Sequence, residues 1–232
     1  MNSEPYSGTL YIVSTPIGNL DDITRRAVKV LEEVDAVVAE DTRKTSTLLR
    51  HLGISKTLIS YHEHNEHKRT GELVRKLESG MSLALVSDAG TPGISDPGFL
   101  IVRECLKHNI PVVPVPGASA LLAALTVSGL PMDRFVFEGF LPHKKGRKTR
   151  IETLKGEERT IILYESPHRI LRTLGELRES FGDRQAVIGR ELTKKFEEIT
   201  HGTLTELERH FESKTIKGEF VLIIAGCNYK QK

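Results

Sequence analysis

The chain has 232 residues, of which 38% are hydrophobic and 28% charged, and its formal net charge is +2. These values are typical of one large or two small globular domains, and they restrict any nucleic-acid contact to a local basic patch. No apolar run approaches the roughly 18 residues of a membrane span, and the first residues lack the basic and apolar regions of a secretory signal. Two distant cysteines, Cys105 and Cys227, fit a reduced, cytoplasmic setting and form no zinc pattern.

The first half of the chain predicts strands that alternate with helices. Short β-rich or apolar runs predict the strands Thr9–Val13, Ala36–Ala39, Thr57–Ser60, Leu83–Val86 and Ile110–Val115. Apolar residues at helical spacing predict helices over Arg25–Val34, Arg43–Leu52 and Phe99–His108, and a further one before Gly80. Such alternation predicts an α/β fold with parallel strands joined by right-handed crossovers.

The connection from Asp88 to Gly98 is the most informative stretch of this half. It holds three glycines and two prolines, so it is neither a helix nor a regular strand. Because it follows a buried strand, it lies where an open α/β sheet binds its ligand. A plain strand-to-helix connection is the alternative. The loop from Ser14 to Thr24 also follows a strand, but it lacks the nucleotide-binding patterns GxxxxGK[ST] and GxGxxG.

Two polar clusters follow the next strands. Glu40 and Asp41 with Arg43 and Lys44 suit a polar site, while Asp41 or Thr42 also suits the N-cap of the following helix. The cluster of histidines between residues 62 and 67 matches no named zinc spacing, so a polar loop or helix start is favoured over a metal site.

Residues 129–133, with a glycine and a proline, are typical of a hinge. This predicts an N-terminal domain of residues 1–130 and a C-terminal domain of residues 131–232. The second half predicts strands over Arg134–Glu138, Thr160–Tyr164, Ala186–Gly189 and Glu197–Thr203, a helix over Thr205–Glu212, and a last strand within residues 217–226. Five basic residues between His143 and Arg150 predict either a solvated loop or a contact with nucleic-acid phosphates. Glu165, His168 and Arg169 follow a strand, which favours a site.

The motifs of the chain, taken in order, resemble a known family. They are STPIGNLDDIT from Ser14, AEDTRKT from Ala39, YHEHNE from Tyr61, SDAGTPGISDPG from Ser87, PVPGAS from Pro114, YESPHR from Tyr164, GRELTK from Gly189 and KGEFVLIIAG from Lys217. Each is weak alone, but their joint order is similar to that of the tetrapyrrole methylase (class III) superfamily, in the branch that methylates small-subunit ribosomal RNA. The similarity extends from about Gly8 to Gly226.

The resemblance implies two α/β domains of the class III methyltransferase type, with S-adenosylmethionine in the cleft between them, and a homodimer. It implies 2′-O-methylation of a cytidine ribose in the decoding region of 16S rRNA in the small ribosomal subunit. The cofactor residues it implies are Thr15, Pro16, Ile17, Gly18, Asp88, Ala89, Gly90, Thr91, Pro92, Gly93, Ile94, Gly117, Ala118, Ser119, Tyr164, Gly218 and Glu219.

A ribose hydroxyl is a weak nucleophile, so a general base within hydrogen-bond reach would assist its methylation. The candidates are Glu165, His168, Glu40 and Asp41, and the sequence does not choose between them. Candidate RNA-binding residues are Arg43, Lys144, Lys145, Arg147, Lys148 and Arg169. No metal is expected. Two alternatives are a methylase of a small tetrapyrrole, whose first loop more often reads GxGxGD, and a non-enzymatic RNA-binding protein, which would not need the Gly/Pro-rich loops.

Overall fold

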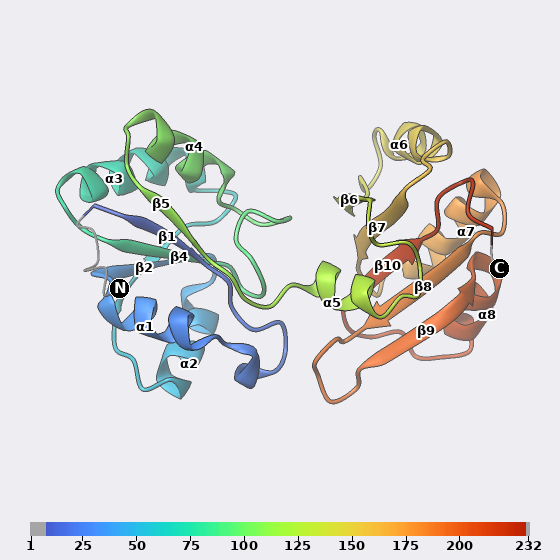
Figure 1. Ribbon diagram of the computed structural model, residues 1–232, viewed down its shortest axis with the longest axis horizontal. Helices are drawn as coiled ribbons and strands as arrows, with labels where there is room; N and C mark the ends of the chain where they lie inside the picture. The colour runs from blue at the N-terminus through green and yellow to red at the C-terminus, as the bar shows by residue number, and fades with distance from the viewer. Residues whose placement is uncertain (1–7, 231–232) are drawn as a thin grey trace. The chain divides into compact units, whose positions relative to one another are not determined.

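The computed structural model describes residues 8–230 and divides the chain into two compact units, one ending at Ser119 and the other starting at Ala120. Each unit is built on its own five-stranded sheet (Figure 1). The first seven residues, in which the sequence predicts no secretory signal, lie outside the described residues. None of the helices between residues 8 and 230 has the length and apolar character that crossing a bilayer requires.

Unit 1 contains a fully parallel sheet with the strand order β3-β2-β4-β1-β5. Its strands are β1 (Leu10–Val13), β2 (Ala36–Ala39), β3 (Thr57–Ser60), β4 (Leu83–Val86) and β5 (Val112–Val115). The central strands β2 and β4 are buried along their whole length, as expected for strands covered on both faces. This confirms the parallel α/β arrangement that the sequence predicts for the first half.

Helices cover both faces of this sheet (Figure 1). The helices α1 (Arg25–Glu33) and α2 (Thr42–His51) pack on one face, where Leu31 joins a cluster with Val37 and Val86. The helices α3 (Glu66–Glu78) and α4 (Phe99–Lys107) pack on the other face, where Ile101 joins a cluster with Leu85. A short 3₁₀ turn, η1 (Leu20–Asp22), lies between β1 and α1. All carboxyl ends of the strands therefore open onto one edge of the sheet.

Unit 2 contains a mixed sheet with the strand order β6-β7-β10-β8-β9. The strands are β6 (Phe135–Phe140), β7 (Thr160–Glu165), β8 (Gln185–Arg190), β9 (Glu198–Thr203) and β10 (Phe220–Ile224). Only β6 and β7 run parallel, and the other neighbours are antiparallel. The helices α6 (Arg147–Leu154), α7 (Ile170–Phe181) and α8 (Leu204–Glu212) bury their apolar residues in one cluster with residues of β7, β8 and β10.

The helix α5 (Ala120–Thr126) belongs to unit 2, where it contacts β7 and β10. Its Ala124 lies against Gly189 of β8, since a Cβ on that glycine would come within 3.4 Å of the Ala124 Cβ. The sequence places the boundary between residues 130 and 131, at the Gly/Pro hinge. The structure places it eleven residues earlier, at Ser119, because α5 packs on the second sheet rather than the first.

Candidate functional site

Two of the predicted cofactor loops of unit 1 are joined by a backbone bridge. The Thr15 N–H donates to the Gly90 carbonyl at 2.9 Å, and the Gly90 N–H donates to the Thr15 carbonyl at 3.0 Å. The Thr15 hydroxyl also donates to the Ser87 carbonyl at 3.2 Å. Gly90 has φ +80°, a conformation that glycine adopts without strain. The loops after β1 and β4 are thus held together at the carboxyl edge of the sheet.

The third predicted cofactor loop of unit 1, Gly117 to Ser119, packs against the first. A Cβ at Gly117 would lie 2.9 Å from the Ser14 Cβ and 3.3 Å from the Ser14 carbonyl oxygen. The Ser14 hydroxyl in turn lies 2.8 Å from the Thr91 hydroxyl. The structure therefore brings together the three Gly-rich segments of this unit. Gly93 adds room, because a Cβ there would meet nothing within 4 Å.

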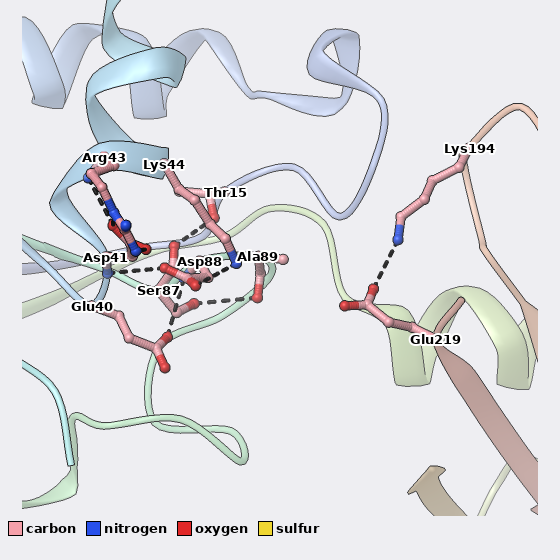
Figure 2. Close-up of polar contacts among 10 residues, drawn as sticks. All are labelled: Thr15, Glu40, Asp41, Arg43, Lys44, Ser87, Asp88, Ala89, Lys194 and Glu219. Carbon is pink, nitrogen blue, oxygen red and sulfur yellow. Dashed lines mark hydrogen bonds and ion pairs between the residues drawn. The ribbon is translucent and has the colours of Figure 1, made fainter. Parts of the chain in front are cut away.

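Asp88 organises the polar groups beside these loops (Figure 2). Its carboxylate accepts a hydrogen bond from the Asp41 N–H at 3.0 Å and forms an ion pair with Lys44 at 2.7 Å. The Asp88 N–H donates to the Glu40 carboxylate at 3.3 Å. Because β2 pairs directly with β4, the residues that follow these strands are neighbours. Lys44 belongs to the polar cluster that the sequence predicts here, but the motifs gave it no specific role.

The two acidic residues after β2 differ in their electrostatics. Burial raises the pKa of the half-buried Glu40 above its usual value, against the opposing effect of the Asp88 N–H, and the nearby Asp88 carboxylate raises it further. The side chain and N–H of Arg43 lower the pKa of Asp41 well below its usual range. Asp41 also caps α2 by accepting from the Arg43 N–H, which confirms the predicted N-cap. Glu40 is therefore better suited than Asp41 to act as a general base.

The candidate base Glu165 lies in a buried network of unit 2. Only 2% of the residue is exposed, and its carboxylate pairs with Arg169 at 2.8 Å. It also accepts from the Thr173 hydroxyl at 2.7 Å and from the Ser166 N–H at 2.8 Å. A carboxylate with these three donors is already satisfied. His168 is exposed in the same loop. We therefore assign Glu165 a structural role in this network.

Arg147 is buried, which argues against the RNA-binding role that its place in the basic run suggests. Its side chain is 3% exposed, with Nε 2.6 Å from Glu176 and Nη2 2.7 Å from the Thr173 hydroxyl. Nη1 donates to the Pro142 carbonyl at 3.2 Å. Every guanidinium nitrogen is thus engaged inside the unit, and we remove Arg147 from the candidate RNA contacts. Ile151 lies one turn further along α6 and is also buried, so helical spacing was the signal for this inward position.

The other candidate RNA-binding residues also differ in their exposure and in their ion pairs. Lys144, Lys145 and Lys148 are exposed. Arg169 is 13% exposed, paired with Glu165, and donates to the Leu141 carbonyl at 3.1 Å. Arg43 is 89% exposed and paired with Asp41. The exposed lysines therefore remain the candidates for phosphate contact, while Arg169 fixes the chain at the start of the run.

The predicted cofactor residues of unit 2 fall at one edge of its sheet. The ring of Tyr164 meets that of Phe137 edge to face, with the ring centroids 4.9 Å apart. Gly218 has φ +93°, and a Cβ there would collide with the Glu191 side chain. Glu219 accepts a hydrogen bond from the Glu191 N–H at its carbonyl, donates its own N–H to the Glu191 carboxylate, and pairs with Lys194 at 2.9 Å (Figure 2). Glu191 and Lys194 stand in the GRELTK motif, whose residue types alone point to no specific role.

The histidine cluster makes local contacts. His62 Nε2 lies 3.1 Å from the Asn65 side-chain nitrogen, and the His62 and His64 rings meet edge to face at 5.9 Å. Within residues 8–230, no three side chains of His, Cys, Asp or Glu are grouped so as to hold a metal ion.

Comparison with known families gives one match over most of the chain. The family of tetrapyrrole (corrin/porphyrin) methylases matches residues 9–208. A protein of Synechocystis sp. named ribosomal RNA small subunit methyltransferase I is 56% identical over 95% of this chain and 80% of its own length. A protein of the same name from Thermotoga maritima is 49% identical over 94% of this chain and 99% of its own length.

Solved structures share the fold at low sequence identity. Diphthine synthase superposes with a TM-score of 0.71 at 17% identity, covering 94% of this chain and 90% of its own. Uroporphyrin-III C-methyltransferase from Thermus thermophilus, solved as a complex with S-adenosyl homocysteine, has a TM-score of 0.67 at 19% identity, covering 94% of this chain and 98% of its own. These similarities place both units within one known fold.

Proposed function

The chain belongs to the tetrapyrrole methylase family and, within it, to the ribosomal RNA small subunit methyltransferases I, and we propose that it transfers a methyl group from S-adenosylmethionine to ribosomal RNA. The acceptor we propose is the ribose 2′-hydroxyl of one cytidine in the decoding region of 16S rRNA. The observation that carries the proposal is the meeting of three Gly-rich loops beside the half-buried Glu40 in unit 1.

The residues present in unit 1 fit the proposed cofactor. The loops after β1, β4 and β5 offer main-chain groups and hydroxyls rather than bulky side chains, and the open side of Gly93 leaves room. The cofactor residues we propose in this unit are Thr15 to Gly18, Asp88 to Ile94, and Gly117 to Ser119. In unit 2 we propose Tyr164, Gly218 and Glu219. When bound, S-adenosylmethionine supplies an electrophilic methyl group on a sulfonium cation.

Glu40 is the general base that we propose. Its carboxylate would accept the proton of the 2′-hydroxyl when that oxygen takes up the methyl group that the cofactor supplies. A raised pKa brings a carboxylate closer to neutral pH, which strengthens it as a base while it stays ionised. The Asp88 N–H orients the Glu40 carboxylate, and Lys44 balances the charge of Asp88. Holding acceptor and donor in line contributes further to the rate.

Two assays separate this proposal from its alternatives. Calorimetry with S-adenosylmethionine tests cofactor binding, which a non-enzymatic RNA-binding protein would lack. Incubation with labelled S-adenosylmethionine and either small ribosomal subunits or a small tetrapyrrole then tests the acceptor. We expect label on the RNA of the subunits only. Label on the tetrapyrrole only would favour a tetrapyrrole methylase, whose fold this chain shares.

Gly117→Ala tests the role of the packed loops. The new Cβ would meet Ser14, whose hydroxyl contacts Thr91, so the third loop must move away from the other two. We expect the Kd for S-adenosylmethionine to rise at least about tenfold. Gly53→Ala, where a Cβ would meet nothing within 4 Å but φ is +71°, controls for the loss of glycine itself. Equal calorimetric affinities for both variants and the wild type would contradict the proposed pocket.

The exposed lysines of the basic run are expected to contact RNA phosphates. Replacing Lys144, Lys145 and Lys148 with alanine should weaken binding to small ribosomal subunits and leave the affinity for S-adenosylmethionine unchanged. Loss of three phosphate contacts should also reduce the slope of log K against log salt by about 2. Filter binding at several salt concentrations measures both effects. An unchanged affinity and slope would remove this run from the RNA interface.

We also propose that the protein acts as a homodimer in the cytoplasm, where ribosomal subunits are made in bacteria such as those of its relatives. Sedimentation velocity of the purified chain at micromolar concentration measures its oligomeric state directly. A monomer that is fully active would contradict the dimer.

A further inference from the structure

The β8–β9 connection, residues 191–197, contains two strained residues. Glu191 has φ +49° and Thr193 has φ +65°, although neither is glycine. A β-branched residue in this region is an outlier, because its Cβ substituents crowd the backbone. In addition, the Thr193 hydroxyl is buried with no hydrogen-bond partner among the described residues. Such features persist where the surrounding structure fixes them, and they are concentrated at functional sites.

Contacts to the turn before β10 fix the first part of this loop. The Glu191 N–H donates to the Glu219 carbonyl at 3.0 Å, and the Glu219 N–H donates to the Glu191 carboxylate at 3.0 Å. Lys194 Nζ lies 2.8 Å from the Glu191 carboxylate and 2.9 Å from that of Glu219. Leu192 is 7% exposed and packs toward Gly189. The loop is therefore rigid up to Lys194.

The rigid loop carries an exposed aromatic side chain. Phe196 is 68% exposed, and the Lys195 Nζ lies 5.7 Å from the centroid of its ring. Glu197 folds back and accepts from the Thr193 N–H, so the chain on both sides of Phe196 is fixed. Because its loop is held by hydrogen bonds and ion pairs, the exposed ring is pre-positioned, which lowers the entropy cost of binding a ligand there.

The same edge of the sheet carries the basic run. Phe220 pairs with both Arg190 and Glu165, and Tyr164 pairs with Phe140, so β6, β7 and β8 end together. The basic run starts just after β6, and the strained loop starts just after β8. Three strand spacings of about 4.8 Å separate these strands, or roughly 15 Å. An extended nucleic-acid strand lying along this edge spans that distance within a few nucleotides.

We propose that Phe196, with Lys195 beside it, is a stacking platform for an unpaired base of the RNA substrate. Single-stranded RNA is recognised by aromatic side chains that stack on splayed bases, next to cations that contact the phosphates. The exposed lysines of the basic run supply the cations at the other end of the edge. This inference rests on the proposed function and adds a base-binding position to it. It fits RNA better than a protein partner because Lys195 lies against the ring and the exposed lysines of the basic run follow β6 at the same edge of the sheet.

The test compares replacements of Phe196 that differ in their ability to stack. Phe196→Trp keeps a flat aromatic face, and its KM for small ribosomal subunits should stay within about twofold of the wild type. Phe196→Leu keeps apolar character without an aromatic face, and its KM should rise between about 5-fold and about 100-fold. In both variants, kcat and the Kd for S-adenosylmethionine should be unchanged. Leu106→Ala is the matched control, since Leu106 is 63% exposed at the end of α4, away from the loop after β4.

The possible results distinguish the stacking platform from a contact between copies and from a failure of the proposed function. Equal KM values for Phe196→Leu and the wild type overturn the platform. A change in oligomeric state in the Phe196→Leu variant, measured by sedimentation velocity, also overturns it and identifies the ring as a contact between copies. Wild-type protein that binds subunits but does not methylate them overturns the proposed function instead. In that case direct binding of the variants to subunits still tests the platform, since a lost stack lowers affinity as well.

Discussion

Glu40→Gln is expected to lower kcat about 10²–10⁴-fold, the range that general-base catalysis contributes. Glutamine has the same shape but does not accept a proton, so the variant isolates the chemical role of the carboxylate. The Kd for S-adenosylmethionine should change little. Single-turnover methylation of small ribosomal subunits measures the chemical step. Glu33→Gln, an exposed carboxylate at the end of α1, is the control and should leave kcat unchanged.

The pH dependence of this step follows from the raised pKa of Glu40. The base works only when ionised, so kcat should fall as pH drops, and it should do so above the pH at which an ordinary glutamate is protonated. Burial also makes the ionised form unfavourable for folding at neutral pH, so Glu40→Gln should be at least as stable as the wild type. Near wild-type kcat in this variant would return Glu165, His168 and Asp41 to consideration.

Arg147→Ala is expected to destabilise unit 2 by about 1–3 kcal/mol, the usual cost of leaving buried hydrogen-bond partners unsatisfied, because Glu176 is partly exposed and keeps its ion pair with Arg172. The change leaves Glu176 without its buried partner and removes the donor to the Thr173 hydroxyl, which itself donates to Glu165. Arg147→Lys should also be costly, because a lysine cannot reproduce these three separate contacts. Denaturant unfolding measures the free energy, with a separate transition for unit 2 if the units unfold independently.

Lys148→Ala is the matched control for this change, since Lys148 is the exposed neighbour of Arg147 on α6. It should alter stability by less than about 0.5 kcal/mol and weaken RNA binding instead. The two variants thus separate the residue that anchors the run from a residue that we propose contacts RNA. Wild-type stability combined with weak RNA binding in Arg147→Ala would restore the role that the sequence suggests.

The parallel half of the fold was predictable because its signals are local. Each apolar run of four or five residues ends at a Gly/Pro-rich or polar stretch, and the alternation with helices implies parallel pairing. The antiparallel pairing of β10 with β7 and β8 was not predictable in the same way. Strands buried on both faces read as continuous apolar runs whatever their direction. The position of α5 likewise depends on which sheet it packs against, and the hinge at residues 129–133 carries no information about that.

The candidate site was predictable where motifs follow strands, and less predictable where a charged side chain is buried. Asp88 and Glu40 follow adjacent strands, so their proximity follows from the order of the sheet. The burial of Arg147 contradicts the composition of its own segment and is visible only in its spacing from Ile151. Phe196 gave no signal at all, because the strain that holds its loop is a property of the backbone.

Mapping of the methylated nucleotide tests the central claim most directly. The pure protein is incubated with labelled S-adenosylmethionine and small ribosomal subunits that lack the modification, and the label is located by nuclease digestion and mass spectrometry. The proposed function predicts label on the 2′-oxygen of a single cytidine in the decoding region of 16S rRNA, and its loss with Glu40→Gln. Label on a base, or no label despite measured cofactor binding, would contradict it.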